Sequence, residues 1–233
     1  MAGIEMYWIS LASGIAATVF FLIMRVRRGG VPALIVKAVA SLFFITTACA
    51  ALAVNAGRLS YGLLIIPGLV CGLLGDIWLD LKYVYPKDKD AYLFGGFYSF
   101  LTGHFFFIAA IYLNYDWTGT TLLSSVVPAL IGIAAVAAME KPMKLDYGRF
   151  RPTCLAYGFV LMTVASSSVV AAAVTGEAAW IVMSAGAVLF LLSDLMLSAT
   201  YFGQGKDTTA YIVANHLFYY AAQFVIASSL LYR

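Results

Sequence analysis

Eight stretches of about 20 mostly apolar residues follow one another along the chain, each bounded by charges, prolines or glycines. An α-helix of about this length can cross the hydrocarbon core of a bilayer. The composition agrees, because 63% of the residues are apolar and 11% are charged, against roughly 45–50% and 25% in soluble chains. The expected spans are Met6–Met24, Pro32–Val54, Ser60–Leu81, Tyr92–Tyr112, Leu122–Met139, Cys154–Thr175, Trp180–Thr200 and Tyr211–Leu231. The sequence therefore predicts an all-α membrane protein with eight transmembrane helices.

The same composition excludes several other classes of protein. A formal charge of +3 gives no basic surface for a nucleic-acid partner, and the apolar content excludes disorder. The cysteines Cys49, Cys71 and Cys154 form no CxxC pair, and each lies in an apolar run, so we interpret them as packing residues. The longest connection, Glu140 to Pro152, is too short to fold alone. We therefore expect one transmembrane domain, 1–233, surrounded by membrane lipid.

Positive charges predict the orientation of the helices. Twelve of the 14 lysines and arginines fall on one side of an eight-span arrangement, and only Arg58 and Arg233 fall on the other. Because cytoplasmic loops are enriched in lysine and arginine, both termini are expected to be extracytoplasmic, in the inner membrane of a bacterium. The first span is followed, not preceded, by its positive cluster, so we do not interpret it as a cleaved signal peptide. The twelve residues are Arg25, Arg27, Arg28, Lys37, Lys82, Lys87, Lys89, Lys141, Lys144, Arg149, Arg151 and Lys206.

An internal similarity relates the third span to the seventh. The sequence LLGDIWLD at 73–80 aligns with LLSDLMLS at 191–198, and the span after each opens with tyrosine. Twelve residues beyond those tyrosines stand His104 and Gln223. Four spans per half give parallel repeats. The repeats would cover 1–115 and 116–233. Each half then places one aspartate at the same depth.

Polar side chains within the spans mark the candidate site. Ionisable groups in the membrane are costly and by default face the interior of the bundle at a functional site. Asp76 and Asp80 are four residues apart and share a helical face, and Asp194 has the matching depth in the other half. The remaining candidates lie in the fourth and eighth spans, and they are Ser99, His104, Asn215, His216, Tyr219, Tyr220 and Gln223. Their convergence predicts a water-accessible cavity in the cytoplasmic half.

Each candidate also has a structural interpretation. Asp80 could be an interfacial residue capped by Lys82 or by solvent. Asn215 and His216 could be interfacial residues at a helix start, and His104 could be a structural hydrogen-bonding group between helices. The two aspartates at matching depth could be buried carboxyls that only join helices. Two histidines without a suitably placed thiolate argue against a zinc site, so we expect neither a metal nor another cofactor.

An ordered set of these residues carries a resemblance over nearly the whole chain. The set is Gly75, Asp76, Leu79, Gly96, Phe100, His104, Ser193, Asp194, Leu195, Tyr219, Tyr220 and Gln223. It resembles the lysoplasmalogenase (YhhN-like) family of membrane hydrolases. The resemblance implies hydrolysis of the vinyl-ether bond of lysoplasmalogen, or of another lysolipid, to a fatty aldehyde and a glycerophospho-alcohol. It also implies that Asp76 and Asp194 are essential, whereas the family pattern does not require a carboxylate at Asp80.

The chemistry of an enol ether agrees with paired carboxyls. Cleavage needs an acid to protonate carbon and an anion to stabilise the resulting cation, and two carboxyls in one apolar cavity can divide these roles. We therefore expect Asp76, Asp194 and His104 to be catalytic and the other candidates to contact the lysophospholipid. The hydrocarbon chain of the lysolipid is expected among Phe97, Phe100, Phe105 and Phe106, with the head group near Lys82, Lys87 or Arg149.

A second hypothesis is a proton-coupled transporter of lipids or small molecules, and a third is a structural or regulatory membrane protein. Parallel repeats and carboxyls within the membrane are also typical of carriers. A carrier, however, needs polar groups that reach both faces of the membrane, and the outer half of these spans is almost wholly apolar. This difference favours the enzyme. The oligomeric state has no signal in the sequence.

Overall fold

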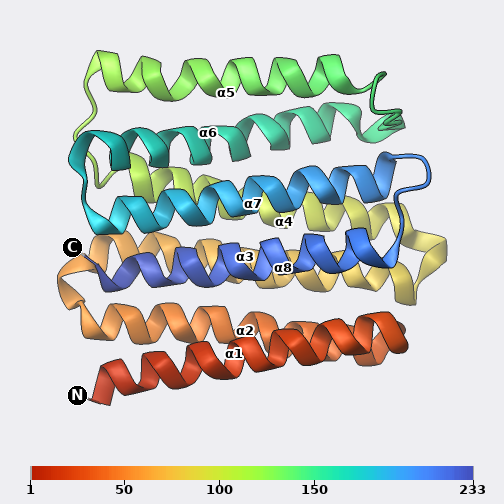
Figure 1. The fold of residues 1–233 in the computed structure, drawn as a ribbon, viewed down its shortest axis with the longest axis horizontal. Helices are drawn as coiled ribbons and strands as arrows, with labels where there is room; N and C mark the ends of the chain where they lie inside the picture. The colour runs from red at the N-terminus through yellow and green to blue at the C-terminus, as the bar shows by residue number, and fades with distance from the viewer. Residues whose placement is uncertain (1, 233) are drawn as a thin grey trace. The chain divides into compact units, whose positions relative to one another are not determined.

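The computed structural model describes residues 2–232, and within them eight helices are long and apolar enough to cross a membrane (Figure 1). No strand occurs among these residues, so the predicted all-α membrane architecture is confirmed. The helices are α1 (Ala2–Arg27), α2 (Gly30–Val54), α3 (Leu59–Val84), α4 (Lys89–Tyr112), α5 (Gly119–Met139), α6 (Arg151–Thr175), α7 (Ala178–Phe202) and α8 (Thr209–Ser228). Four 3-10 turns accompany them, namely η1 (Ala56–Arg58), η2 (Pro86–Asp88), η3 (Gly148–Phe150) and η4 (Ser229–Leu231).

Local sequence signals explain several of the helix ends. The Thr118 side chain accepts a hydrogen bond from the Thr121 amide at the start of α5, and Thr121 reciprocates in a capping box. Gly176 ends α6 with a φ of +65°, a left-handed conformation that glycine adopts without steric cost. Most helices extend a few residues beyond the predicted spans, because helical structure continues past the apolar segment that alone defines a span.

The chain divides into two compact units. Unit 1 runs to Ala110 and also contains the end of the chain from Ala227 on, whereas unit 2 is Ile111–Ile226. The structure does not confirm a repeat, so the proposed halves 1–115 and 116–233 stay a prediction.

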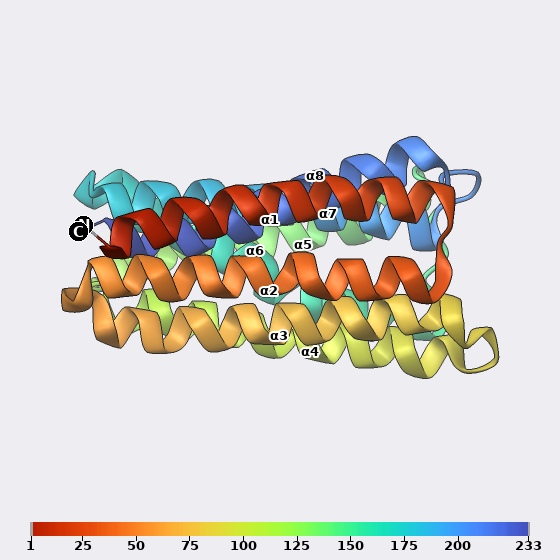
Figure 2. The same cartoon turned by 90° about the horizontal axis from the view of Figure 1, so that it is seen from below.

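In unit 1, α2 packs against both α1 and α3 (Figures 1 and 2). Glycines let α3 and α4 approach closely. A Cβ atom built on Gly103 of α4 would lie 2.9 Å from the carbonyl oxygen of Gly68 on α3, and one built on Gly75 would lie 2.6 Å from the Phe100 ring. Close backbone approach at small residues is a common way for helices to associate in lipid, where burial of apolar surface gives no advantage.

Both ends of the chain lie at the same end of unit 1. Tyr7, near the start of α1, is hydrogen-bonded to Ser228 at 2.8 Å between hydroxyl oxygens. At the α2–α3 connection, the Asn55 side chain donates to the carbonyl oxygen of Tyr232 at 3.2 Å. This arrangement requires an even number of crossings, as the eight helices provide. Which side faces the cytoplasm stays a prediction from the charges.

In unit 2, α6 packs against α5 and α7. The proline inside α5, Pro128, removes a backbone donor from its helix. Close to it, Ser166 of α6 donates to the carbonyl oxygen of Ser125 at 2.6 Å. Serine side chains often bond backbone groups loosened by proline in transmembrane helices. Gly186 allows α7 to meet Ile226 of α8, because a Cβ there would lie 2.6 Å from the Ile226 side chain.

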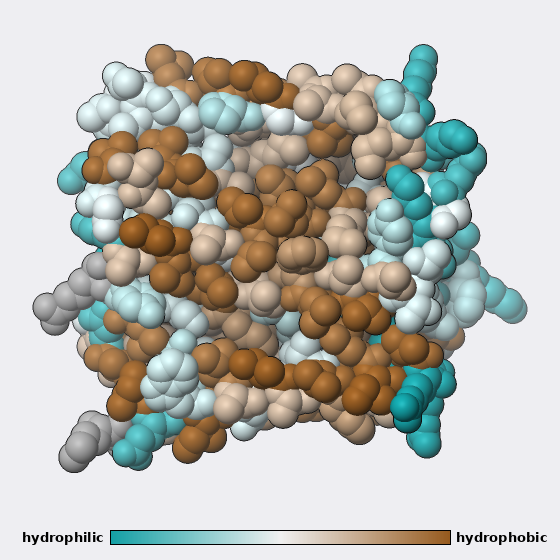
Figure 3. All heavy atoms as spheres, in the orientation of Figure 1, coloured by the Kyte–Doolittle hydropathy of each residue, from teal (hydrophilic) through white to brown (hydrophobic). Residues whose placement is uncertain are grey.

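The surface is that of a protein solvated by lipid. On the face drawn in Figure 3, hydrophobic residues cover the middle of the helices, and hydrophilic residues gather toward helix ends. Large apolar side chains such as Ile9 and Ile131 are 66% and 64% exposed. Such exposure over helices of this length indicates contact with hydrocarbon rather than water.

Labelling of single cysteines tests the predicted orientation. In a chain with Cys49, Cys71 and Cys154 replaced by alanine, we expect a membrane-impermeant maleimide to label Gly57→Cys in intact cells. Lys87→Cys, in the exposed η2 turn, should react only after permeabilisation. The reverse pattern would place the termini in the cytoplasm.

Substitution of Gly103 tests the α3–α4 contact. Because its Cβ would meet backbone, which cannot move aside, Gly103→Ala should destabilise the protein by about 1–3 kcal/mol and lower its unfolding temperature in detergent. The matched control is Gly119→Ala, where a Cβ has no neighbour within 4 Å. Equal unfolding temperatures for the two variants would contradict the packing described.

Candidate functional site

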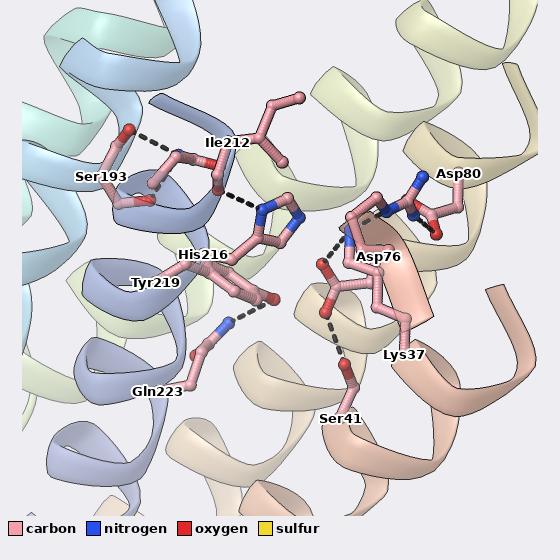
Figure 4. Close-up of polar contacts among 11 residues, drawn as sticks. Lys37, Ser41, Asp76, Asp80, Ser193, Ile212, His216, Tyr219 and Gln223 are labelled. Carbon is pink, nitrogen blue, oxygen red and sulfur yellow. Dashed lines mark hydrogen bonds and ion pairs between the residues drawn. The ribbon is translucent and has the colours of Figure 1, made fainter. Parts of the chain in front are cut away.

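A cluster of buried charged groups joins α1, α2 and α3 in unit 1 (Figure 4). Lys37 Nζ lies 3.1 Å from Asp76 Oδ1 and 3.3 Å from Asp80 Oδ1. The Ser41 hydroxyl donates to the other oxygen of Asp76 at 2.6 Å. Arg25 forms an ion pair with Asp80 through Nη2. Asp76, Asp80 and Lys37 are 2%, 3% and 4% exposed, so these charges are removed from solvent. We call Arg25, Lys37, Ser41, Asp76 and Asp80 the charge cluster.

Helical spacing assembles the charge cluster. Lys37 and Ser41 are four residues apart on α2, and Asp76 and Asp80 are four apart on α3, so each pair lies on one face of its helix. The two faces meet where α2 packs against α3. Arg25 completes the cluster from the last turn of α1. Its guanidinium carbon lies 5.5 Å from the Phe21 ring centroid and 5.1 Å from that of Tyr83, within range of cation–π interaction.

The charges of the cluster balance. Two cations, Arg25 and Lys37, face two carboxylates, Asp76 and Asp80. An isolated charge in the membrane interior is strongly disfavoured, whereas opposite charges in contact stabilise each other's ionised form. The arrangement therefore presents Asp76 as a carboxylate held between an ammonium and a hydroxyl.

Asp194 of unit 2 has a different environment. It lies on α7, half-buried, and accepts a hydrogen bond from the phenol of Tyr157 on α6. One turn further along α7, Ser198 is hydrogen-bonded to Tyr147 at 2.8 Å. Asp76 and Asp194 are thus each contacted by the helix that precedes their own in the chain. Asp76 contacts the Lys37 ammonium and the Ser41 hydroxyl, and Asp194 contacts the Tyr157 phenol.

Four of the five candidates on α8 form hydrogen bonds within unit 2 (Figure 4). Asn215 donates to the carbonyl oxygen and the hydroxyl of Ser193, at 2.7 and 3.0 Å. His216 Nδ1 lies 2.7 Å from the carbonyl oxygen of Ile212, so this nitrogen carries the proton. Gln223 Nε2 donates to the Tyr219 hydroxyl at 2.9 Å. Tyr220 is buried and stacks edge-on against Tyr219.

The candidates on α4 belong to unit 1. His104 is 1% exposed, and its ring centroid lies 5.9 Å from that of Phe107. Ser99 is half-buried. Of the four phenylalanines expected to contact the lipid chain, Phe97 and Phe100 are buried and Phe105 is 53% exposed.

A comparison with models of protein families shows which family the chain belongs to. The model of the YhhN family matches residues 7–230. The chain belongs to the YhhN family. This is the lysoplasmalogenase-like family, so the resemblance predicted from the residues is confirmed. Membership of the YhhN family suggests a hydrolase. No curated protein and no solved structure matches the chain.

The structure corrects two structural interpretations. Asp80 is not capped by solvent, because it is buried and its partners include Arg25 and Lys37. Asn215 is likewise buried, at 5% exposure, and not a solvated residue at a helix start. Among the described residues of this YhhN protein, no group of three His, Cys, Asp or Glu side chains is placed to hold a metal ion.

Sequence reasoning missed four residues of these networks. The charge pattern explains Arg25 and Lys37 as markers of the cytoplasmic side, and no motif points to Ser41 or Tyr157. A signal existed for Lys37, since a lysine inside a span needs a buried partner and Asp76 and Asp80 were the available carboxylates. Tyr157 had no comparable signal, because tyrosine is ordinary in a membrane helix.

Removal of one charge tests the charge cluster. Lys37→Met leaves two carboxylates with one cation, and we expect a loss of about 3–5 kcal/mol in stability, measured as a lower unfolding temperature in detergent. The double variant Lys37→Met/Asp76→Asn restores the charge balance and should recover much of the loss. Lys87→Met, at an exposed position, is the matched control and should unfold like the parent protein. A Lys37→Met protein as stable as this control would contradict the cluster.

Proposed function

We propose that this YhhN protein is a membrane hydrolase that cleaves the vinyl-ether bond of lysoplasmalogen or a closely related lysolipid. The products would be a fatty aldehyde and a glycerophospho-alcohol. Family membership supports hydrolysis in general. The observation that carries the proposal is the buried carboxylate of Asp76, which Lys37 and Ser41 hold within an apolar bundle. Such a group is suited to stabilising a cation that forms during a reaction at low dielectric.

The proposed reaction has three steps. A carboxylic acid transfers its proton to the β-carbon of the vinyl ether, and the electron pair of the double bond forms the new C–H bond, leaving an oxocarbenium ion. Water then adds to the α-carbon and gives up a proton. The hemiacetal then collapses: its hydroxyl loses a proton as the aldehyde C=O forms, the bond between the α-carbon and the glycerol oxygen breaks, and that oxygen takes a proton as it leaves. Only the first step creates a cation, so the stabilising anion acts there.

The carboxyls are assigned to these steps by their partners. Asp76, balanced by Lys37, is the proposed anion that stabilises the oxocarbenium ion and accepts a proton from water. Asp194, bonded to the phenol of Tyr157, is the proposed proton donor. His104 is retained as a further catalytic residue of unit 1. The remaining candidates are proposed to contact the lysolipid, which would approach from the cytoplasmic leaflet of a bacterial inner membrane.

Substitution of the aspartates tests the proposal directly. Asp76→Asn and Asp194→Asn should each reduce aldehyde release from lysoplasmalogen by roughly 10²–10⁴-fold, the range for loss of acid–base catalysis. Residues that act as a unit are non-additive, so the double variant should be little slower than either single variant. Asp88→Asn, which removes an exposed carboxylate in η2, is the control and should keep full activity. Near-normal turnover by either well-folded variant would sink the assignment.

A solvent isotope effect tests the first step. If proton transfer to carbon limits the rate, aldehyde release should be slower in deuterium oxide by a primary isotope effect. Turnover should also be insensitive to EDTA, and loss of activity restored by zinc would show a metal requirement instead. Proton-coupled flux of lipid through reconstituted vesicles without aldehyde would favour the transporter hypothesis.

A further inference from the structure

Arg25 has a donor that its ion pair does not use. Its side chain is 9% exposed, and Nη2 contacts Asp80. The Nε–H group of the same guanidinium is buried and has no hydrogen-bond partner among the described residues. Phe21 and Tyr83 flank the guanidinium, and these rings offer no strong acceptor to Nε. A buried donor of a charged group without an acceptor is unfavourable and is normally satisfied by a ligand or water.

The chemistry of this donor fits a phosphate oxygen. Guanidinium groups bind carboxylates and phosphates through parallel N–H donors in a planar fork, and the Nε side of this fork remains after Asp80 has taken Nη2. Lys37 supplies a second cation in the same cluster through its contact with Asp80. Arg25 also lies in the last turn of α1, next to the exposed Arg27 and Arg28. A helix end that carries such a cationic run lies at the level of lipid phosphates rather than of acyl chains.

The spacing along α3 matches a glycerol backbone. Asp80, the partner of Arg25, and Asp76 are separated by four residues, a rise of about 6 Å along a helix. In a lysolipid, five single bonds join the phosphorus to the ether oxygen at the other end of glycerol. At roughly 1.5 Å each, these bonds span about 6 Å when extended. A phosphate at the level of Arg25 therefore brings the ether oxygen to the level of Asp76.

We propose that the guanidinium of Arg25, supported by Lys37, binds the phosphodiester of the lysolipid substrate. This subsite rests on the proposed function for its ligand, and it replaces the expected head-group contacts with Lys82, Lys87 or Arg149. A phosphocholine or phosphoethanolamine head group is zwitterionic, so its binding leaves the net charge of the cluster unchanged. The register places the ether bond, and not the middle of the alkenyl chain, beside the Asp76 carboxylate.

Binding of two non-hydrolysable ligands tests the subsite without turnover. The ligands are a 1-O-alkyl lysophosphocholine and the 1-O-alkylglycerol of the same chain length, which lacks the phosphate, and affinity is measured by titration calorimetry in detergent. Arg25→Lys keeps a cation for Asp80 but lacks Nε. We expect it to bind the lysophosphocholine about 10–100-fold more weakly, the equivalent of a hydrogen bond to a charged group, with unchanged affinity for the alkylglycerol.

Two further variants separate this role from folding and from surface charge. Arg25→Gln/Asp80→Asn removes both members of the ion pair and leaves no unbalanced charge there, and it should show the same selective loss for the phosphate-bearing ligand. Arg27 lies two residues after Arg25 and is exposed. Arg27→Gln therefore removes a positive charge from the surface only, and this variant should bind both ligands like the parent protein.

The binding measurements can contradict this subsite independently of whether the protein releases aldehyde. Unchanged binding of the lysophosphocholine by Arg25→Lys, or an equal loss for both ligands, would overturn the subsite even if aldehyde release is observed. Arg25-dependent binding without aldehyde release would retain the subsite and reject the hydrolase. Inorganic phosphate should not displace the lysophosphocholine at equal concentration, and displacement would identify free phosphate as the ligand.

Discussion

The absence of water from the hydrocarbon core governs this structure, because every charge placed there needs an opposite charge in contact with it. The charge cluster meets that requirement with two cations and two carboxylates from α1, α2 and α3. The requirement ties three helices together at one level of unit 1. Within the cluster, Asp80 is the partner of Arg25 and the second partner of Lys37. The cluster therefore connects these helices and is also the centre of the proposed site.

Close helix packing gives the cluster its surroundings. Glycines such as Gly75 and Gly103 bring α3 against α4, and the Phe100 ring covers Gly75 directly beside Asp76 in the chain. In unit 2, Asp194 accepts a hydrogen bond from a phenol, so Asp76 and Asp194 have unequal electrostatic surroundings. Unequal surroundings are what a division into stabilising anion and proton donor requires. This difference is consistent with the different roles proposed for Asp76 and Asp194.

Much of the fold was predictable from residue type alone. Spans of apolar residues predict helices because backbone groups in lipid can be satisfied only within the helix, and the tight connections leave few alternatives. The carboxyls Asp76, Asp80 and Asp194 were also identifiable, since an ionisable residue in a span is rare. Arg25 and Lys37 were not identified, because a cation near the end of a span has two explanations, topology and pairing. Only the contacts that Arg25 of α1 and Lys37 of α2 make with the aspartates of α3 distinguish them.

The sequence by itself determined the eight helices, the family and the aspartates of greatest interest, because hydrophobicity and intramembrane charge are properties of residues in order. The tertiary structure decided which partners those aspartates have. Lys37 contacts Asp76 and Asp80 only because two helical faces meet, and Tyr157 reaches Asp194 only because α6 packs on α7. Such contacts depend on the rotation of each helix about its axis. Apolar residues on every side of a membrane helix leave that rotation unspecified in the sequence, since lipid and protein interior are equally apolar.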